Sequence, residues 1–319
     1  MYNEIAHAER VYASAQQKSA AASSPIIASW RRCMSMYQLA PEQNHAPLRL
    51  TDQEFQAVRQ QSEQLIREAT EELDRLFLTI GKAGCCLLLT DSKGVALDRR
   101  GVGSEDKEFL SHGLWPGVVW SEASAGTNGI GTALADERSV TIFRDQHFLS
   151  SNINLSCTSA PIRDHRGQLT AILDISTCRE DVNEMAVAIL SQAVRDAALR
   201  IETNLFRSAF RGARIIMVPS GGNPAAALLA VDKDDLILGA TRAARLALKL
   251  DDAHIHAGVP ASDALHEDRR VDGADLVEAE RSALRRVLSR NHGNVSQAAH
   301  QLGISRATMH RKMKKLALH

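Results

Sequence analysis

The chain has 319 residues, of which 44% are hydrophobic and 24% are charged. This composition is typical of folded globular proteins and excludes a disordered, collagenous or membrane-embedded chain, and the length leaves room for one to three domains. The 38 basic and 38 acidic residues cancel, and zero net charge argues against nucleic acid as a partner if the charge is spread evenly.

The N-terminal segment, residues 1–50, is predicted to form a helical arm. Its first 20 residues lack the apolar core of a secretory signal, and the longest apolar stretches of the chain are too short to span a bilayer. The five cysteines form no CxxC pair, which is typical of free thiols in a reducing compartment. We therefore expect a cytoplasmic protein that does not associate with membranes.

Residues 51–206 are predicted to fold into an α+β domain built on one sheet. A capping box at Thr51 opens a helix to about Phe77, and a second cap at Asp181 opens a long helix to about Phe206. Apolar runs bounded by turn residues predict strands between these helices. The predicted strands are 85–91, 95–100, 139–143, 157–164 and 169–176.

Several strings in this region resemble a known family. They are IIASWRRC (26–33), LWPGVVWSEASAGTNGIGTAL (114–134), DQHF (145–148) and CTSAPIRD…GQLTAILDIS (157–176). Over roughly residues 25–206 the chain resembles the GAF sensor domain of the AcoR-like regulators of acetoin catabolism. The resemblance implies a small effector held between one face of the sheet and the surrounding helices and loops, and a homodimer formed through the long terminal helices.

The resemblance and the chemistry of the side chains together point to a set of candidate ligand-binding residues. They are Cys85, Leu87, Trp115, Trp120, Thr127, Asn128, Ile130, His147, Cys157 and Asp174. The effector implied by the resemblance is a short alcohol, an acetoin-like molecule or a related metabolite.

Other interpretations remain open for several of these residues. Core packing would explain Trp115 and Trp120 equally well, and a redox pair at Cys85 and its neighbour competes with a structural cysteine in a strand. His147 and Cys157 are metal-ligating types, but no second spaced ligand pair accompanies them. No metal and no other cofactor is predicted.

Residues 207–260 are predicted to form a short, truncated PAS-like α/β segment. The string AAALLAVDKDDLILGATRAARLALKL predicts strand, turn, strand and helix, and it resembles the first part of a PAS domain. A flexible break is expected at 221–224, and residues 261–275 are predicted to be a polar linker.

The last segment, residues 276–319, is predicted to be an all-α domain. It holds nine basic and two acidic residues, which gives it a charge of +7 and leaves −7 on residues 1–275. A cationic segment on an anionic body is typical of a region that meets a polyanion, although a solvated basic helix that binds nothing would carry the same charge.

The pattern within this segment predicts a helix-turn-helix. After a first amphipathic helix, Asn294 is expected to cap a short second helix, with Gln297 as its capping-box partner. Gly303 then makes a tight turn, and Ser305 caps a third helix that runs to about Leu316.

The third helix separates its residues into two faces. Met309 and Met313 lie on the side of a small core, while Arg306, His310 and Lys314 recur every four residues on the other side. Such a helix fits the DNA major groove, where N-terminal residues reach base edges and later cations hold phosphates. The candidates near bases are Ser305, Arg306, Thr308 and His310, the phosphate candidates are Arg311, Lys312, Lys314 and Lys315, and Asn294 is counted with them as DNA-binding.

The string GNVSQAAHQLGISRATMHRKMKKL resembles the Fis-type helix-turn-helix that closes many bacterial enhancer-binding regulators. The resemblance implies dimerisation through the first helix and two half-sites about one helical turn apart. His310 stands where the Fis protein itself has Arg, so its base preference does not carry over. A helical hairpin used only for dimerisation is the alternative interpretation.

Members of that regulator class place an AAA+ ATPase between sensor and helix-turn-helix. This sequence contains no GxxxxGK[ST] string and no GAFTGA loop. We therefore predict a transcription regulator that binds double-stranded DNA under the control of a small effector, is not an enzyme, and works without ATP hydrolysis or remodelling of an alternative sigma factor. The alternatives are a modulator that hetero-oligomerises with an ATPase-bearing regulator and a GAF-fold thiol redox enzyme.

Overall fold

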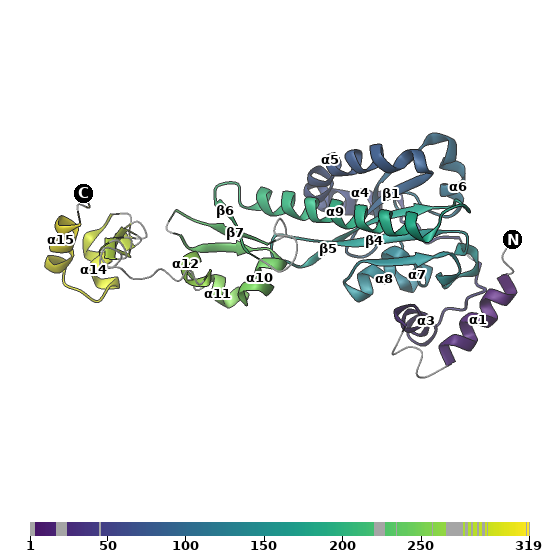
Figure 1. The fold of residues 1–319 in the computed structure, drawn as a ribbon, viewed down its shortest axis with the longest axis horizontal. Coiled ribbons are helices and arrows are strands. Elements are labelled where there is room, and N and C mark those ends of the chain that lie inside the picture. The colour runs from purple at the N-terminus through teal and green to yellow at the C-terminus, as the bar shows by residue number, and fades with distance from the viewer. Residues whose placement is uncertain are drawn as a thin grey trace. The chain divides into compact units, whose positions relative to one another are not determined.

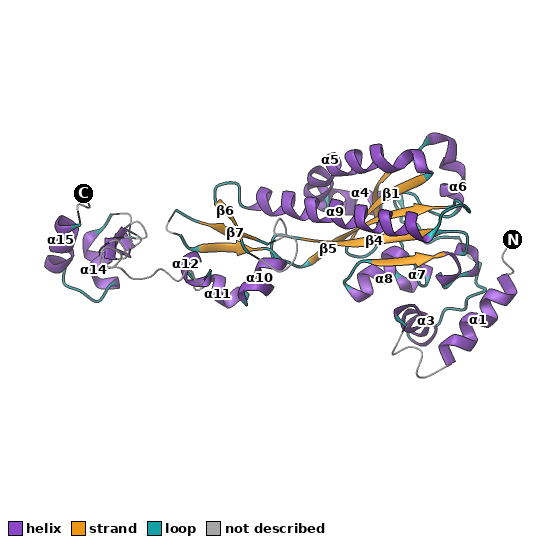
Figure 2. Ribbon diagram, in the orientation of Figure 1, coloured by secondary structure: helices purple, strands orange, loops and turns teal. Residues whose placement is uncertain are grey.

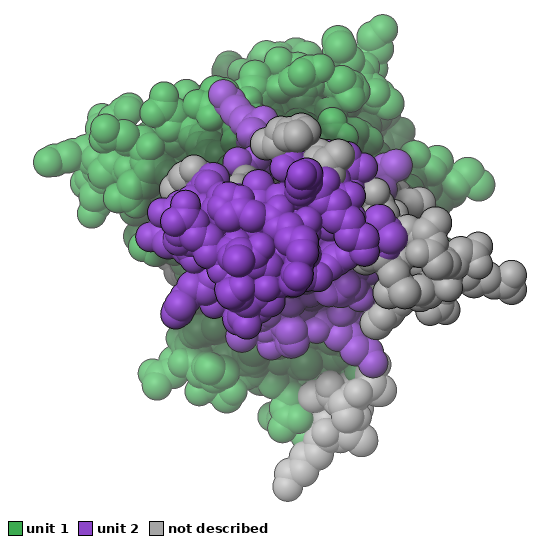
Figure 3. Space-filling view, turned by 90° about the vertical axis from the view of Figure 1, so that its left-hand side faces the viewer, with its two compact units in different colours: residues 1–209 green, residues 210–319 purple. Residues whose placement is uncertain are grey.

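The computed structural model describes most of the chain. The described residues are 4–16, 24–44, 46–219, 227–233, 235–256, 258–265, 277, 280–281, 283–285, 287–288, 291, 293–316 and 318. The chain divides into two compact units, residues 1–209 and 210–319, which Figure 3 colours separately. None of the helices in the described part of the chain is long and apolar enough to cross a membrane.

Unit 1 is built on an antiparallel sheet of five strands (Figure 2). They are β1 (Cys85–Asp91), β2 (Ala96–Arg100), β3 (Val140–Phe143), β4 (Ser156–Arg163) and β5 (Leu169–Thr177), in the order β2-β1-β5-β4-β3. The α+β fold and the five predicted strands are therefore confirmed. The central strands β1, β5 and β4 are almost entirely buried, because helices cover both sides of the sheet.

Two layers of helices enclose the sheet of unit 1 (Figure 1). The long helices α5 (Glu63–Ile80) and α9 (Glu184–Ala209) pack on what we call the helical face of the sheet. The shorter helices α6 (Asp106–Ser111), α7 (Glu122–Ala125) and α8 (Gly129–Asp136) cover the opposite side, which we call the sensing face. Each face has its own hydrophobic core.

The N-terminal arm is helical and lies beside α7 and α8 (Figure 1). It contains α1 (Glu4–Gln16) and α3 (Pro25–Ser35). Val11 of α1 and Trp30 of α3 are buried with Phe148 and Leu149 in a small separate core. The arm is therefore packed on the sensing-face side of unit 1.

Two helix boundaries in unit 1 differ from those expected. The helix predicted from Thr51 is two helices, α4 (Asp52–Gln61) and α5, which meet at Ser62. The predicted cap at Asp181 is wrong, because this carboxylate pairs with Arg179 and the Asn183 side chain accepts the hydrogen bond from the Ala186 N–H at the start of α9. The capping box at Thr51 is present.

The first part of unit 2 is a three-stranded antiparallel sheet with helices on it. Its strands are β6 (Arg214–Met217), β7 (Leu228–Val231) and β8 (Ile237–Ala240), and its helices are α10 (Arg242–Leu248), α11 (Asp252–His256) and α12 (Ala261–Ala264). The first four residues of the predicted linker 261–275 thus form α12, whose Ala261 and Ala264 are buried against the sheet. Most of the linker, and the expected break at 221–224, lie outside the described residues.

The C-terminal part of unit 2 contains the predicted helix-turn-helix. The helices α14 (Val295–Gln301) and α15 (Arg306–Lys315) flank a turn at Gly303, whose positive φ of 66° favours glycine. The Asn294 side chain caps α14, but the predicted capping-box bond is absent, because the Asn294 N–H donates to the Asn291 carbonyl instead. Residues 276 to 291, where the first helix was predicted, are described only in part.

Candidate functional site

Helix α15 is anchored by one face and exposed on the other. The Ser305 Oγ accepts a hydrogen bond from the Thr308 N–H, with an N–O distance of 3.1 Å, and so fixes the start of the helix. Met309 is fully buried and packs with Ala298 and Ala299 of α14. This packing turns the opposite, basic face of α15 outward.

Most of the predicted DNA-binding residues lie on this outward face. The exposed ones on α15 and its cap are Ser305, Arg306, His310, Arg311, Lys314 and Lys315. Two others are partly engaged, because Lys312 forms an ion pair with Glu280 and the Thr308 hydroxyl hydrogen-bonds to Ser305 at 2.9 Å. Asn294 is exposed, but its side-chain oxygen is used in capping α14.

Two predicted ligand-binding residues, Cys85 and Leu87, lie on the other side of the sheet from the rest. They pack in the core of the helical face, whereas Cys86 and Leu88 contribute to the core of the sensing face. Successive side chains of a strand point to opposite faces of the sheet, so a prediction that is wrong by one residue assigns each side chain to the wrong face. Because β1 is buried on both faces, its uninterrupted apolar sequence does not show which residues face which side.

Asp174 is a buried carboxyl group on the central strand of the sensing face. The Ser159 hydroxyl donates to its Oδ1 and the Ser176 hydroxyl to its Oδ2, the latter at 2.5 Å. Burial raises the pKa of Asp174 to about 6, although both hydroxyls act in the opposite direction. Burial thus makes Asp174 a weaker acid than an exposed aspartate.

His147 and Cys157 lie next to this cluster and contact each other. The His147 Nδ1–H donates to the Arg144 carbonyl at 2.8 Å, which leaves Nε2 to accept from the Cys157 thiol at 3.4 Å. Burial lowers the pKa of His147 to about 4 and raises the pKa of Cys157 well above its usual value. A neutral imidazole beside a neutral thiol does not form a reactive thiolate.

The pKa values of the remaining cysteines are raised as well. Burial raises the pKa of Cys33 and Cys178 to about 12, that of Cys85 to about 11 and that of Cys86 well above its usual value. Within the described residues, no group of three or more His, Cys, Asp and Glu side chains is placed to hold a metal ion.

The other predicted ligand-binding residues support the roof over the sensing face. Trp120 and Ile130 are buried there, and the Trp120 indole N–H donates to the Gly113 carbonyl at 3.0 Å. The Asn128 side chain caps α8 through the Gly131 N–H and donates to the Trp120 and Gly126 carbonyls. These contacts give Trp120 and Asn128 a structural role that does not require a ligand.

The first turn of α8 sits directly on the Asp174 cluster. A Cβ atom at Gly129 would come within 2.4 Å of the Ser159 Oγ and 2.8 Å of the Asp174 Oδ1. Only glycine permits this approach. The first turn of α8 therefore packs closely against Asp174 and Ser159.

A polar clamp joins the N-terminal arm to the roof, and the sequence did not reveal it. Arg32 of α3 donates from Nε and Nη2 to the two carboxylate oxygens of Glu122 at 2.9 and 2.8 Å. The Ser29 hydroxyl donates to the same carboxylate at 2.5 Å and also contacts the Thr127 hydroxyl at 2.6 Å. The partners are about 90 residues apart, so the SWRRC string within the GAF resemblance was the only available signal.

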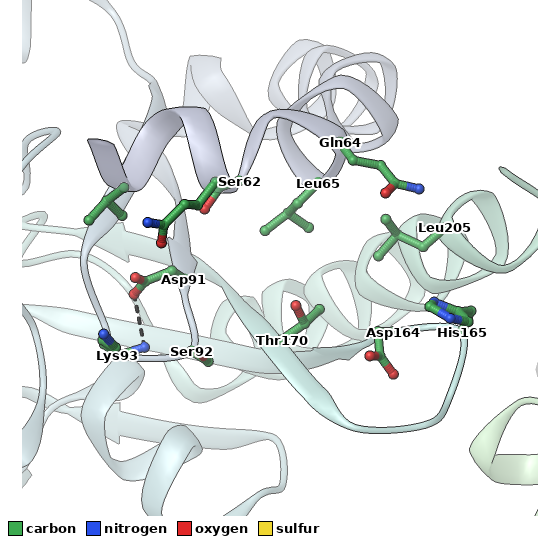
Figure 4. A pocket seen from close by; sticks show the side chains of 12 residues that line it. Ser62, Gln64, Leu65, Asp91, Ser92, Lys93, Asp164, His165, Thr170 and Leu205 are labelled. Carbon is green, nitrogen blue, oxygen red and sulfur yellow. Dashed lines mark hydrogen bonds between the residues drawn. The ribbon is translucent and has the colours of Figure 1, made fainter. Parts of the chain in front are cut away.

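A separate cavity of about 330 Å³ opens between the α4–α5 junction, the turn after β1 and the turn after β4 (Figure 4). Leu65 and Leu205 line it together with two aspartates. Asp91 accepts from the Lys93 N–H at 2.8 Å and Asp164 from the Gln168 N–H at 2.9 Å, so both carboxylates serve their own turns. None of the predicted ligand-binding residues lines this cavity.

Two family models match this chain, one within unit 1 and one at the end of unit 2. Residues 62–201 match the GAF domain family, and residues 276–316 match the family described as bacterial regulatory protein, Fis family. The chain combines a GAF domain with a Fis-type helix-turn-helix. All five cysteines are free thiols.

Relatives with known names share part of this chain. The acetoin catabolism regulatory protein of Cupriavidus necator is 34% identical over 226 residues, which cover 69% of this chain and 34% of that protein. The acetoin dehydrogenase operon transcriptional activator AcoR of Bacillus subtilis is 30% identical over 151 residues, covering 47% of this chain and 25% of that protein. The chain thus spans about a third of the length of the first of these relatives.

One solved structure supports the fold over a longer stretch. It is the crystal structure of the E. coli DhaR(N)-DhaL complex, with a TM-score of 0.52 and 18% sequence identity over 72% of this chain and 79% of that chain. At this identity the similarity concerns the fold alone.

Proposed function

We propose that this protein is a DNA-binding transcription regulator whose GAF domain senses a small molecule. The observation that carries the proposal is the outward face of α15, which presents Arg306, His310 and Lys314 on a helix held by Met309 against α14. Its exposed N-terminal residues suit base edges, and its later cations suit phosphates. The match to the Fis family over residues 276–316 supports the same role.

The effector is proposed to bind on the sensing face of unit 1. The names of the relatives associate them with acetoin catabolism, which supports a small oxygenated metabolite as the class of ligand. On the sensing face, Asp174 and its serine partners are buried polar groups beneath α8, and the clamp between Arg32 and Glu122 links that roof to the N-terminal arm. A ligand that displaces α8 would therefore change the docking of the arm.

We further propose that the protein acts as a homodimer that occupies DNA, without ATP hydrolysis. A dimer would place two copies of α15 on half-sites about one helical turn apart. The sequence has no GxxxxGK[ST] string with which to bind a nucleoside triphosphate. We expect it to act on DNA in the cytoplasm.

Mobility-shift titrations of the full chain on DNA from its own operon region test the DNA-binding role. Arg306→Ala should weaken binding by about 10-fold or more, whereas Arg166→Ala, which removes the same charge from an exposed turn of unit 1, should leave it unchanged. Affinity should fall by about 10³–10⁵ between 50 and 200 mM salt if about 6–10 phosphates are contacted. Equal binding by the two variants, or a flat salt response, would contradict the proposed docking.

The second candidate is a modulator that hetero-oligomerises with an ATPase-bearing regulator. It is favoured by the match to the acetoin catabolism regulatory protein, which is 34% identical in sequence but covers only 34% of the length of that regulator. Sizing the chain alone and after co-expression with such a relative separates the two functions. A self-sufficient homodimer that shifts DNA supports the regulator, whereas DNA binding only in the mixed oligomer supports the modulator.

A further inference from the structure

Arg99 of β2 is a buried cation that uses only part of its hydrogen-bonding capacity. Its side chain is 9% exposed, and its Nη1 donates to the Asp106 Oδ1 at 2.8 Å. Within the described residues, its Nε and Nη2 are buried and have no hydrogen-bond partner. Buried charged donors are normally paired, because removing an N–H from water without a partner costs free energy.

Two aromatic rings lie close to this guanidinium group. The Arg99 Cζ lies 4.5 Å from the centre of the Trp115 ring and 5.5 Å from that of Phe109. Cation–π contacts of this kind stabilise the charge but supply no hydrogen-bond acceptor in the guanidinium plane. The N–H groups point outward within that plane, so the two rings leave Nε and Nη2 unsatisfied.

The two unpaired atoms form one edge of the guanidinium group. Nε and Nη2 carry two roughly parallel N–H bonds whose spacing matches the two oxygens of a carboxylate. Two other arginines of unit 1 use the same edge in this way. Arg32 donates from Nε and Nη2 to Glu122 at 2.9 and 2.8 Å, and Arg179 to Asp181 at 2.8 and 2.6 Å.

Arg99 lies at the rim of the sensing face. It is paired in register with Leu88 on β1, and β2 is the outermost strand on that side of the sheet. Phe109 and Trp115 belong to the sensing-face core, and Trp115 is only half-buried. Since Nε and Nη2 are themselves buried, a small molecule reaches them only if a neighbouring side chain such as the half-buried Trp115 moves.

We propose that Arg99 binds the carboxylate of a small organic acid and that this acid is the effector of the GAF domain. The inference rests on the sensing role proposed above for this face. Asp106 neutralises the charge of Arg99 but accepts only from Nη1. The edge formed by Nε and Nη2 therefore remains for the two oxygens of the ligand. An acid, rather than the neutral alcohol or hydroxyketone implied by the GAF resemblance, is the class that this edge selects.

Thermal unfolding of the full chain, followed by tryptophan fluorescence, tests the ligand class directly. The probes are monocarboxylates of two to six carbons with their 2-hydroxy and 2-oxo forms, each compared with its neutral amide, and acetoin. At least one acid should raise the unfolding midpoint in a concentration-dependent way, and its amide should not. The inference is overturned if no acid does so, or if amides or acetoin stabilise the protein as well as the acids do.

Variants locate the effect at Arg99. Arg99→Lys keeps the charge but loses the two parallel N–H donors, so it should weaken the affinity for the stabilising acid about 10-fold or more. Arg179→Lys changes an exposed arginine whose edge Asp181 already fills, and it should leave that affinity unchanged. Equal affinity in wild type and Arg99→Lys would contradict the inference.

A purely structural role for Arg99 makes a different prediction. If the edge awaits a ligand, the double variant Arg99→Met with Asp106→Asn should unfold without ligand at the same or a higher temperature than wild type, because it removes an incompletely paired buried charge together with its partner. A lower midpoint would assign Arg99 to structure and overturn the inference. DNA binding by the unliganded wild type is measured separately, so failure of the proposed function is distinguishable from failure of the carboxylate site.

Discussion

The clamp between the N-terminal arm and the roof of the sensing face allows a quantitative prediction for Arg32→Ala. The Glu122 side chain is 2% exposed and receives two hydrogen bonds from Arg32. Removing one partner of a buried pair costs ~3–5 kcal/mol, because the other charge stays buried without compensation. Arg32 itself is 26% exposed, and water can therefore enter in its place. We expect a loss of ~2–4 kcal/mol in the free energy of unfolding of unit 1.

Denaturant unfolding followed by tryptophan fluorescence measures this loss in the full chain. All three tryptophans, at 30, 115 and 120, lie in unit 1, so their signal reports that unit alone. Arg179→Ala is the matched control, since Arg179 pairs with Asp181 at 2.6 Å and both side chains are exposed, at 50% and 67%. Such an exposed pair contributes little to stability.

A double-mutant cycle separates the clamp from a general effect of truncating Arg32. Glu122→Gln added to Arg32→Ala removes the stranded charge and should recover at least about half of the lost stability. If Arg32→Ala costs no more than Arg179→Ala, or if Glu122→Gln recovers nothing, the clamp does not hold the arm.

Two further predictions concern the buried cluster. Because burial raises the pKa of Asp174 to about 6, the folded state binds this proton more tightly than the unfolded state does, and wild type should lose up to ~3 kcal/mol of stability relative to Asp174→Asn as the pH rises from about 4 to about 6. His147, with its pKa lowered to about 4, acts in the opposite direction but equally in both proteins, so a parallel pH dependence would refute the assignment. Gly129→Ala should destabilise unit 1 by ~1–3 kcal/mol through overpacking, whereas Gly103→Ala, whose nearest neighbour would be 4.0 Å away, should be nearly neutral in the same unfolding assay.

Local patterns were sufficient to predict the helix-turn-helix. The cap at Ser305, the turn at Gly303 and the core position of Met309 each depend on residues within one or two turns of the chain. The engagement of Lys312 by Glu280 could not be foreseen, because it joins residues 32 positions apart. The sequence therefore predicted helix α15 but not its tertiary contact with Glu280.

The sensing face was predictable in outline but not in detail. Apolar runs located β1, yet a strand buried on both faces shows no alternation, so Cys85 was chosen where Cys86 faces the roof. Arg99 sits in the run VALDRR, where a charged residue is typical of an exposed strand end. Only the fold places Phe109 and Trp115 over it and turns an ordinary arginine into a buried one.

The short connection between β5 and α9 links the sensing face to the far end of unit 1. Asp174 lies three residues before the end of β5, and α9 then runs without interruption from Glu184 to Ala209, where unit 1 ends. A helix of 26 residues is about 39 Å long at ~1.5 Å per residue. Tilting it by about 5° at the end nearest β5 moves the other end by about 3 Å, comparable to the spacing of one base pair along B-DNA.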